Sequence, residues 1–591
     1  MKNKKVITEK PLDFNNSLKR LFEKIGVYKK YIISSIIFSS FGTILTIVGP
    51  NQLTKIIDEI TNNLMGNINT NYVLKISVML FILYILSFIF SYLQGFLMST
   101  ATQKYAKDLR KEISIKLNKL PLKFFDKNKS GDILSIISND VDTMASSLNQ
   151  SIGSLLSAII TLIGVTIMMF YTNVTMSITA VLASITGFLF IGIILSKSQK
   201  YFENQQKGLG KLNSHVEEIY SSFDIVKAYN GVDDSINEFE KLNNNLYHNA
   251  RMSQFLSGLM MPLMNFVGNF GYVAVTVVGA YLVIEGYITF GVIVAYMIYI
   301  RLFTNPLSTI AQSFTSLQLV VAASERIYNF LEENEENTFE VLNKLENKST
   351  KGKVEFKNVV FGYDKNKTII KNFNASVKPG QTVAIVGPTG AGKTTLVNLL
   401  MRFYELNSGH ILIDDIDIKS LAKNNIHNIF CMVLQDTWLY DDTILNNIKF
   451  NNEKVKKEDV IKVCKDIGID HLIKTLPNSY NTILSEADNL SSGEKQLLTI
   501  ARAMLKDASL LILDEATSNI DTRTELLVQN AMNKLMINKT SFIIAHRLST
   551  IKNADLILVL KDGNIIEQGN HNELIKEKGF YSELYNSQFE E

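Results

Sequence analysis

The chain has 591 residues and nearly balanced charge, because 60 lysines and arginines stand against 57 aspartates and glutamates. This balance excludes a strongly basic nucleic-acid-binding protein and an acidic disordered tail, so we expect no nucleic acid among the partners. The two cysteines, Cys431 and Cys464, are too few for a disulfide framework or a cysteine metal cluster. The apolar fraction of 46% is ordinary for a soluble protein, but the apolar residues are concentrated in parts of the chain.

Long stretches without charged residues characterise the first half. No Asp, Glu, Lys or Arg occurs in 31–54, 76–103 or 151–196, and between Met252 and Ser324 the only charges are Glu285 and Arg301. A helix that crosses a bilayer needs about 20 mainly apolar residues, and a helix satisfies its own backbone polar groups in lipid. The sequence therefore predicts six spanning helices: Tyr31–Pro50, Ile76–Phe96, Leu155–Tyr171, Val174–Leu195, Met260–Val283 and Gly291–Leu307.

Lysine and arginine gather before the first span and in the long loops after the second and fourth spans. This asymmetry predicts a multi-pass protein of the plasma (inner) membrane with both termini and the two long loops in the cytoplasm. Helical spacing of apolar residues in Gln103–Leu120 and Gln199–Ile219 predicts that spanning helices continue beyond the bilayer. Leu120-Pro-Leu should break the first extension, and a new short helix should begin at Ser130.

The domain organisation follows from these shifts in composition. We expect a cytoplasmic N-terminal segment over 1–30, a transmembrane domain over 31–325 and a linker over 326–350. A soluble domain over 351–591 follows, and its alternating Val354–Val360 predicts an edge strand. The predicted fold class is an α-helical membrane domain of six helices with long cytoplasmic extensions, followed by an α/β P-loop ATPase domain.

A glycine-rich loop lies between a predicted buried strand and a predicted helix. Val383–Val386 is the strand, and Leu396–Leu400 opens the helix. This is the Walker A pattern in its required context, which opposes the alternative of a glycine-rich turn with a chance lysine. Backbone N–H groups and the helix N-terminus should hold the phosphates of ATP, Lys393 should contact the β- and γ-phosphates, and the Thr394 hydroxyl should ligate Mg²⁺. The predicted ATP-binding residues here are Gly387, Pro388, Thr389, Gly390, Ala391, Gly392, Lys393, Thr394 and Thr395.

Two further polar groups follow apolar strands downstream. Ser509–Leu513 ends in Asp514 and Glu515, which fit a Walker B metal ligand and a carboxylate that orients or deprotonates water. His546 follows the apolar strand Ser541–Ala545. A single histidine after a strand is more often structural, but its place after both Walker elements favours a catalytic role.

In order and spacing these motifs resemble the exporter half-transporters of the ATP-binding cassette (ABC) family, with a type-1 transmembrane domain, from about residue 30 to residue 585. The resemblance implies that Tyr363 stacks on adenine, that Gln435 reaches Mg²⁺, and that His546 is the switch histidine. It also implies a D-loop containing Ser518 and Asp521. The signature sequence, which would contact the ATP bound by a partner chain, corresponds to Leu490, Ser491, Ser492, Gly493 and Glu494.

The same resemblance implies a mechanism. Two nucleotide-binding domains sandwich ATP head to tail, and their closure reverses a membrane cavity from inward-facing to outward-facing. The two long loops would end in coupling helices that touch nucleotide-binding domains, the second one on the partner chain.

The signature departs from the family pattern Leu-Ser-Gly-Gly-Gln. Ser492 adds a Cβ where the backbone must approach phosphate, and Glu494 adds a negative charge near a polyanion. Because Walker A, Glu515 and His546 are intact, the chain resembles the catalytically complete half of bacterial heterodimeric multidrug exporters. We therefore expect a second, homologous half-transporter as partner, with a homodimer that tolerates the variant signature as the alternative.

The predicted function is ATP-driven export of drugs, lipids or peptides, with lipid bilayer and substrate as further partners. Alternatives are a homodimeric lipid or multidrug exporter, and a nucleotide-gated or regulatory membrane subunit with low ATPase activity. The predicted spans exclude soluble cassette ATPases, and importers of this superfamily usually keep the two parts on separate chains. Arg301, the one charge in the sixth span, is expected to line the cavity; the alternative is snorkelling near the cytoplasmic interface or pairing with the partner chain.

Overall fold

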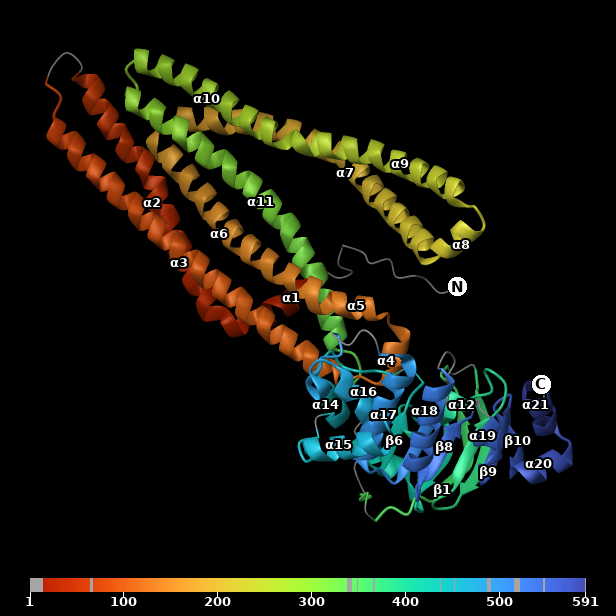
Figure 1. Cartoon of the computed structure of the whole chain (residues 1–591). Helices are drawn as coiled ribbons and strands as arrows, with labels where there is room; N and C mark the ends of the chain where they lie inside the picture. Colours follow the sequence, from red (N-terminus) through yellow and green to blue (C-terminus); the bar gives the residue numbers. More distant parts are fainter. Residues whose placement is uncertain are drawn as a thin grey trace. The chain divides into compact units, whose positions relative to one another are not determined.

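The computed structural model describes residues 14–63, 67–336, 343–347, 349–364, 367–435, 437–450, 452–485, 490–514, 521–545 and 548–589. The chain divides into two compact units (Figure 1). The first contains Met1–Asn118 and Lys129–Glu333, and the second contains Lys119–Asn128 and Asn334–Glu591.

The first unit is entirely helical in its described residues. A short 3-10 turn, Gly26–Tyr28, follows α1, and a π-helical segment, Ile136–Asp140, precedes α6. The helices are α1 (Phe14–Ile25), α2 (Lys29–Asn62), α3 (Thr70–Leu117), α5 (Ser130–Ser135), α6 (Val141–Thr172), α7 (Val174–Ser221), α8 (Phe223–Ala228), α9 (Val232–Gly258), α10 (Met260–Ile284) and α11 (Phe290–Leu331).

The predicted spans lie in α2, α3, α6, α7, α10 and α11. Among the described residues, five helical stretches are long and apolar enough to cross a membrane, and α7 adds the shorter apolar stretch Val174–Thr186. The predicted extensions are confirmed, because α3 and α7 each run for 48 residues. Only Asn173 separates α6 from α7, the helices that contain the third and fourth predicted spans.

Packing in the membrane unit centres on α11, which runs beside α6 and also contacts α2 and α10 (Figure 1). The buried Tyr296 ring packs edge-on against Tyr299, and its hydroxyl donates to the Met169 carbonyl at 2.5 Å. At the start of α11, the Asp58 carboxylate accepts hydrogen bonds from the Gly291 N–H at 2.9 Å and the Thr289 hydroxyl at 2.8 Å. These contacts fix the position of α11 along its neighbours.

The second unit contains two sheets and the helices around them. The four-stranded sheet has the order β2-β1-β4-β5, and the six-stranded sheet has the order β10-β9-β3-β8-β7-β6. The strands are β1 (Val354–Phe361), β2 (Ile370–Val377), β3 (Thr382–Val386), β4 (Ser408–Ile413), β5 (Ile416–Asp417), β6 (Phe430–Val433), β7 (Leu510–Asp514), β8 (Thr540–Ile544), β9 (Leu556–Lys561) and β10 (Asn564–Gly569). The helices are α4 (Leu122–Lys127), α12 (Lys393–Leu400), α13 (Lys423–Ile429), α14 (Ile444–Lys449), α15 (Lys457–Asp466), α16 (Asp470–Thr475), α17 (Ser492–Lys506), α18 (Thr522–Met536), α19 (Leu548–Lys552), α20 (His571–Glu577) and α21 (Phe580–Phe589).

The predicted strands at Val383, Ser509 and Ser541 are confirmed as β3, β7 and β8. The prediction that Val354–Val360 is an edge strand is wrong, because β1 pairs with β2 on one side and with β4 on the other. Alternating apolar residues report that one face of a strand is buried, and they carry no information about neighbours within the sheet.

Two apolar cores hold this unit together. One fills the space between the two sheets and includes Phe356, Phe373 and Phe542. The other joins the far face of the six-stranded sheet to the helices α14 to α18. These two cores hold the carboxyl ends of β3, β7 and β8, and the loops that follow them, in a fixed position relative to α17, the helix that begins at the signature.

Candidate nucleotide-binding site

The loop between β3 and α12 adopts a backbone that requires glycine. Gly390 and Gly392 have φ of +83° and +104°, and a Cβ on Gly387 would lie 2.2 Å from the Leu560 carbonyl oxygen. Nothing lies within 4 Å of where a Cβ of Gly390 would be, so the loop backbone is open at this point. Together with the N-terminus of α12, this arrangement suits a phosphate chain surrounded by N–H donors.

Lys393 is the first residue of α12, and its side chain turns back over the loop. Its Nζ donates to the Gly387 carbonyl at 2.6 Å and to the Pro388 carbonyl at 3.2 Å. Burial lowers the pKa of this lysine, and the negative charge of Asp514 acts in the opposite direction. The ammonium group therefore lies at the mouth of the loop, within electrostatic reach of Asp514.

The strand order explains how Walker A and Walker B come together. β8 lies between β3 and β7, and all three run parallel. Ile385 of β3 and Asp514 of β7 are both level with Ile544 of β8. Two strand spacings separate Ile385 from Asp514, or about 10 Å. Parallel strands end at the same sheet edge, so the Asp514 carboxylate and the loop after β3 share one edge.

The candidate Mg²⁺ ligands differ in exposure. Thr394 is exposed at the start of α12, Asp514 is half-buried, and Gln435 is exposed beyond the end of β6. β6 pairs with β7 in parallel, so Gln435, which follows the carboxyl end of β6, lies on the same side of the sheet as Asp514. A hydroxyl, a carboxylate and an amide oxygen are the hard oxygen donors that Mg²⁺ prefers, so these residues fit the ion.

Tyr363, the candidate adenine platform, lies beside the Walker A helix. Its hydroxyl donates to the hydroxyl of Thr395 at 3.3 Å; Thr395 is buried, whereas Thr394 is exposed. Its ring meets Tyr404 edge-on with centroids 4.9 Å apart. Tyr404 is 7% exposed, and its hydroxyl donates to the carboxylate of Asp126 in α4. No sequence pattern pointed to Tyr404, because its role depends on contacts with residues far away in the chain.

The signature forms the first turn of α17 and its N-cap. The Ser491 hydroxyl accepts from the Glu494 N–H at 3.3 Å, and the Glu494 carboxylate accepts from the Ser491 N–H at 2.7 Å. This reciprocal arrangement is a capping box. The Glu494 charge is thus held at the positive end of the helix, where it reduces the attraction of that end for a phosphate.

The D-loop prediction is only partly within the described residues. Asp521 caps α18, because its carboxylate accepts from the N–H groups of Arg523 at 3.1 Å and Thr524 at 2.9 Å. The backbone hydrogen bond from Thr524 is the main reason why the pKa of Asp521 is lowered. Glu515, Ser518 and His546 lie outside the described residues.

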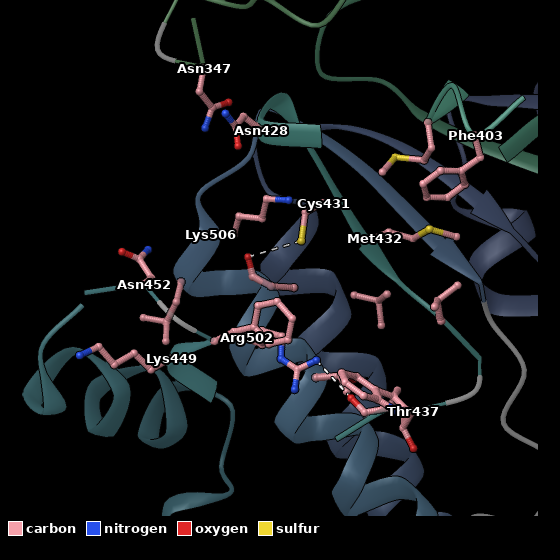
Figure 2. A pocket seen from close by; sticks show the side chains of 18 residues that line it. Asn347, Phe403, Asn428, Cys431, Met432, Thr437, Lys449, Asn452, Arg502 and Lys506 are labelled. Atoms are coloured by element: carbon pink, nitrogen blue, oxygen red, sulfur yellow. Dashed lines mark hydrogen bonds between the residues drawn. The ribbon is translucent and has the colours of Figure 1, made fainter. Parts of the chain in front are cut away.

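A groove of about 910 Å³ opens beside β6 and α17 (Figure 2). Trp438 and Phe450 are half-exposed at its wall, and the Arg502 guanidinium lies over the Phe450 ring at 4.5 Å. Arg502 also donates to the Trp438 carbonyl at 3.2 Å, drawn as a dashed line in Figure 2. The groove therefore offers aromatic surface next to positive charge, and it begins just after Gln435.

In the membrane unit, Arg301 is exposed on α11 between the buried residues Ile300 and Thr304. The structure also reveals a pair that sequence reasoning missed. Arg326 makes two hydrogen bonds to the buried carboxylate of Asp140, at 2.8 and 2.6 Å. The pair connects the end of α11 to the segment before α6, and no local pattern announces it because the two residues are far apart in the chain.

Comparison with known proteins agrees with this geometry. Residues 32–307 match the ABC transporter transmembrane region, and residues 370–518 match the ABC transporter family. A fatty acid ABC transporter ATP-binding/permease protein of Mycobacterium bovis is 42% identical over 85% of this chain and 79% of its own length. An uncharacterized ABC transporter ATP-binding protein of Bacillus subtilis is 38% identical over 98% of this chain and 96% of its own. An ATP-dependent lipid A-core flippase of Syntrophus aciditrophicus is 32% identical over 85% of this chain and 83% of its own.

Proposed function

Since this chain belongs to the ABC transporter family, as a multi-pass membrane protein that couples ATP hydrolysis to transport, we propose that it is one half of a heterodimeric exporter of amphipathic, lipid-type substrates. Its nucleotide-binding unit and both termini would lie in the cytoplasm, as the distribution of lysine and arginine suggests.

In this proposal the loop between β3 and α12 binds the phosphates of ATP, and Lys393 neutralises the β- and γ-phosphates. Thr394, Asp514 and Gln435 would hold Mg²⁺, which supplies positive charge opposite the phosphate oxygens. Tyr363 would carry the adenine. Glu515 would orient the attacking water, and His546 would act beside the γ-phosphate.

The observation that carries the heterodimer is the position of Glu494. Its carboxylate is held in the capping box of α17 by the hydrogen bond from the Ser491 N–H, and turning away from the helix end would break that bond. A site completed by this signature would bind ATP next to a fixed negative charge. The intact Walker A motif would form an efficient ATP site with a signature that matches the family pattern. A second copy of this chain carries the same variant signature, so a different chain would have to supply it.

The groove beside α17 fits the same proposal. We assign it to the second cytoplasmic loop of the partner half-transporter. The corresponding segment of this chain, α8 with the residue that follows it, carries side chains suited to such a groove, because Ile225 and Tyr229 are 61% and 84% exposed. The aromatic walls of the groove would contact apolar side chains of the partner loop, and Arg502 would bind a carboxylate of that loop.

The proposed substrate class rests on two relatives, one named for fatty acids and one for lipid A-core. The first covers 85% of this chain at 42% identity, which favours a substrate that combines a polar head with hydrocarbon.

Catalysis is tested by Glu515→Gln in the protein purified in lipid, with ATP hydrolysis as the measurement. We expect turnover to fall by about a hundredfold or more while ATP binding persists, since the water would lose its base. Wild-type turnover in this variant would remove the catalytic role of Glu515 and favour a regulatory subunit.

Assembly is tested by isolating the tagged chain from its native membrane and identifying the chain that co-purifies. We expect a homologous half-transporter whose own residue after Walker B, or switch histidine, is replaced. A chain that purifies alone as a dimer, with full ATPase and transport activity, would refute the heterodimer.

A further inference from the structure

Arg301 is the only charged residue within any of the six predicted spans. It lies eleven residues after Phe290, the first residue of α11. At 1.5 Å per residue this is about 16 Å, close to the middle of a hydrocarbon layer about 30 Å thick. From this depth the side chain cannot readily reach the water at the start of α11. Toward the other end, the predicted span continues for six residues to Leu307, about 9 Å, so snorkelling in that direction is the alternative that the binding experiment below decides.

The guanidinium has no partner within the described part of the chain. Neither a carboxylate nor any other acceptor lies within hydrogen-bond distance of it there. The side of α11 that points away from Arg301 at this level is occupied, because Tyr299 and Ile300 are buried against neighbouring helices. Arg301 therefore projects from the one side of α11 that this unit leaves open.

That side of α11 carries a polar stripe. Arg301, Asn305, Ser308 and Gln312 fall within an arc of about 60° on a helix with 3.6 residues per turn. Arg301, Asn305 and Gln312 are exposed. Arg301 and Asn305 lie within the predicted span and would each cost free energy if they faced hydrocarbon, so this part of the stripe belongs against a water-filled cavity or a polar ligand.

Toward the start of α11 the same side becomes apolar. Val294, Met297 and Ile298 are half-buried and lie within about 60° of the Arg301 direction. The surface thus changes, within about one turn, from cation and amide to aliphatic side chains. This sequence of groups matches a molecule with one anionic end and a hydrocarbon tail.

The charge also limits the head group. One guanidinium balances one negative charge, and its planar fork forms two parallel hydrogen bonds to a carboxylate. A phosphate monoester with two charges would leave one uncompensated in a low-dielectric region. We propose that Arg301 and Asn305 bind the head group of a long-chain carboxylate anion, whose tail lies along Ile298, Met297 and Val294. This site rests on the proposed export function, to which it adds the charge and shape of the substrate.

Binding can be measured without ATP, so that a failure of transport does not affect the result. The assembled transporter, with any co-purifying subunit, is placed in phosphatidylcholine nanodiscs and titrated with radiolabelled oleate or oleyl alcohol. We expect Arg301→Gln to weaken oleate binding at least tenfold and to leave oleyl alcohol unchanged. Arg301→Lys should lose less, since it keeps the charge. Arg251→Gln, in α9 outside the spans, is the matched control and should bind oleate as the wild type does.

Equal oleate affinity in Arg301→Gln and wild type would overturn the proposal, as would an equal loss of oleyl alcohol binding. If Arg301→Gln no longer assembles in size-exclusion chromatography, Arg301 is paired with the partner and the proposal is also wrong. A competition on the wild type decides independently of any variant. Laurate and dodecyl sulfate should displace oleate, whereas displacement by oleylamine at the same concentration would contradict an anion site.

Discussion

The Tyr404 hydroxyl donates a hydrogen bond to the Asp126 carboxylate, while the Tyr404 ring lies edge-on against Tyr363. Asp126 belongs to α4, the short helix after the long helix α3, and Leu122 of the same helix packs against the core between the two sheets. Tyr363 contacts the Walker A helix through Thr395. A continuous line of contacts therefore connects the proposed adenine platform to α4, the short helix that follows α3.

Tyr404→Phe removes the hydrogen bond to Asp126 and keeps the ring against Tyr363. We expect basal ATPase activity to stay within about twofold, and stimulation by transported substrate to fall by at least about twofold, as for residues that carry coupling between sites. Asp126→Asn should likewise keep the basal ATPase activity and lower the stimulation by transported substrate. Full substrate stimulation in both variants would show that this contact does not transmit the signal.

Glu494→Gln tests the effect of charge at the signature. Glutamine can accept the same hydrogen bond from the Ser491 N–H, so α17 keeps its cap while the negative charge disappears. We expect the Michaelis constant for ATP to fall, or turnover to rise, by about two- to fivefold, which corresponds to 0.3–1 kcal/mol at a helix N-terminus.

The matched control is Glu494→Ala, which removes the charge and also the hydrogen bond from the Ser491 N–H, while the Ser491 hydroxyl still caps the helix. The loss of this one hydrogen bond should lower the stability of the nucleotide-binding unit by about 0.5 kcal/mol in thermal unfolding, whereas Glu494→Gln should not. Unchanged ATP kinetics in Glu494→Gln would show that the variant signature does not impair its site.

Removing one partner of the Asp140–Arg326 pair should be more costly than removing both. The side chain of Asp140 is 8% exposed, so Arg326→Gln leaves a buried carboxylate without its counter-ion. We expect Arg326→Gln to destabilise the membrane unit by about 3 kcal/mol in a thermal assay in detergent. Asp140→Asn combined with Arg326→Gln should recover part of the loss. Equal stability of wild type and Arg326→Gln would show that the pair does not stabilise the fold.

Cys464 should react with alkylating agents only when the nucleotide-binding unit unfolds. Burial is the main cause that raises the pKa of its thiol to about 11. At pH 8 about 0.1% is then thiolate, the reactive form. The pKa of the Cys464 thiol is higher in the folded chain than in the unfolded chain, so the protonated thiol favours the folded state. This contribution to the free energy of unfolding is present below about pH 9 and is lost as the pH rises to about 11.

Iodoacetamide labelling at pH 8, followed by mass spectrometry, should therefore modify Cys464 slowly in buffer and rapidly in urea. Cys431 is the internal comparison, since burial also raises the pKa of its thiol. Rapid labelling of Cys464 in buffer, at the rate seen in urea, would mean that α15 opens readily.

Local sequence predicted the spanning helices and the strands that become β3, β7 and β8, and it pointed to the loop of the proposed nucleotide site. Charge-free runs predicted the spans, and strand–loop–helix order identified Walker A from Gly387 to Thr394, because these signals lie within about 20 neighbouring residues. The loop conformation required glycine at Gly390 and Gly392 in the left-handed region, and the sequence already had it there.

Only the tertiary structure decided which strands and side chains meet. β1 is central because β2 and β4 both pair with it, and β8 separates β3 from β7 although it follows both in the chain. Tyr404 meets Asp126, and Arg326 meets Asp140, across separations of 278 and 186 residues. Periodicity and composition describe which face of one element is buried, but long-range pairing depends on how all the buried faces pack together, and no local window of the sequence contains that information.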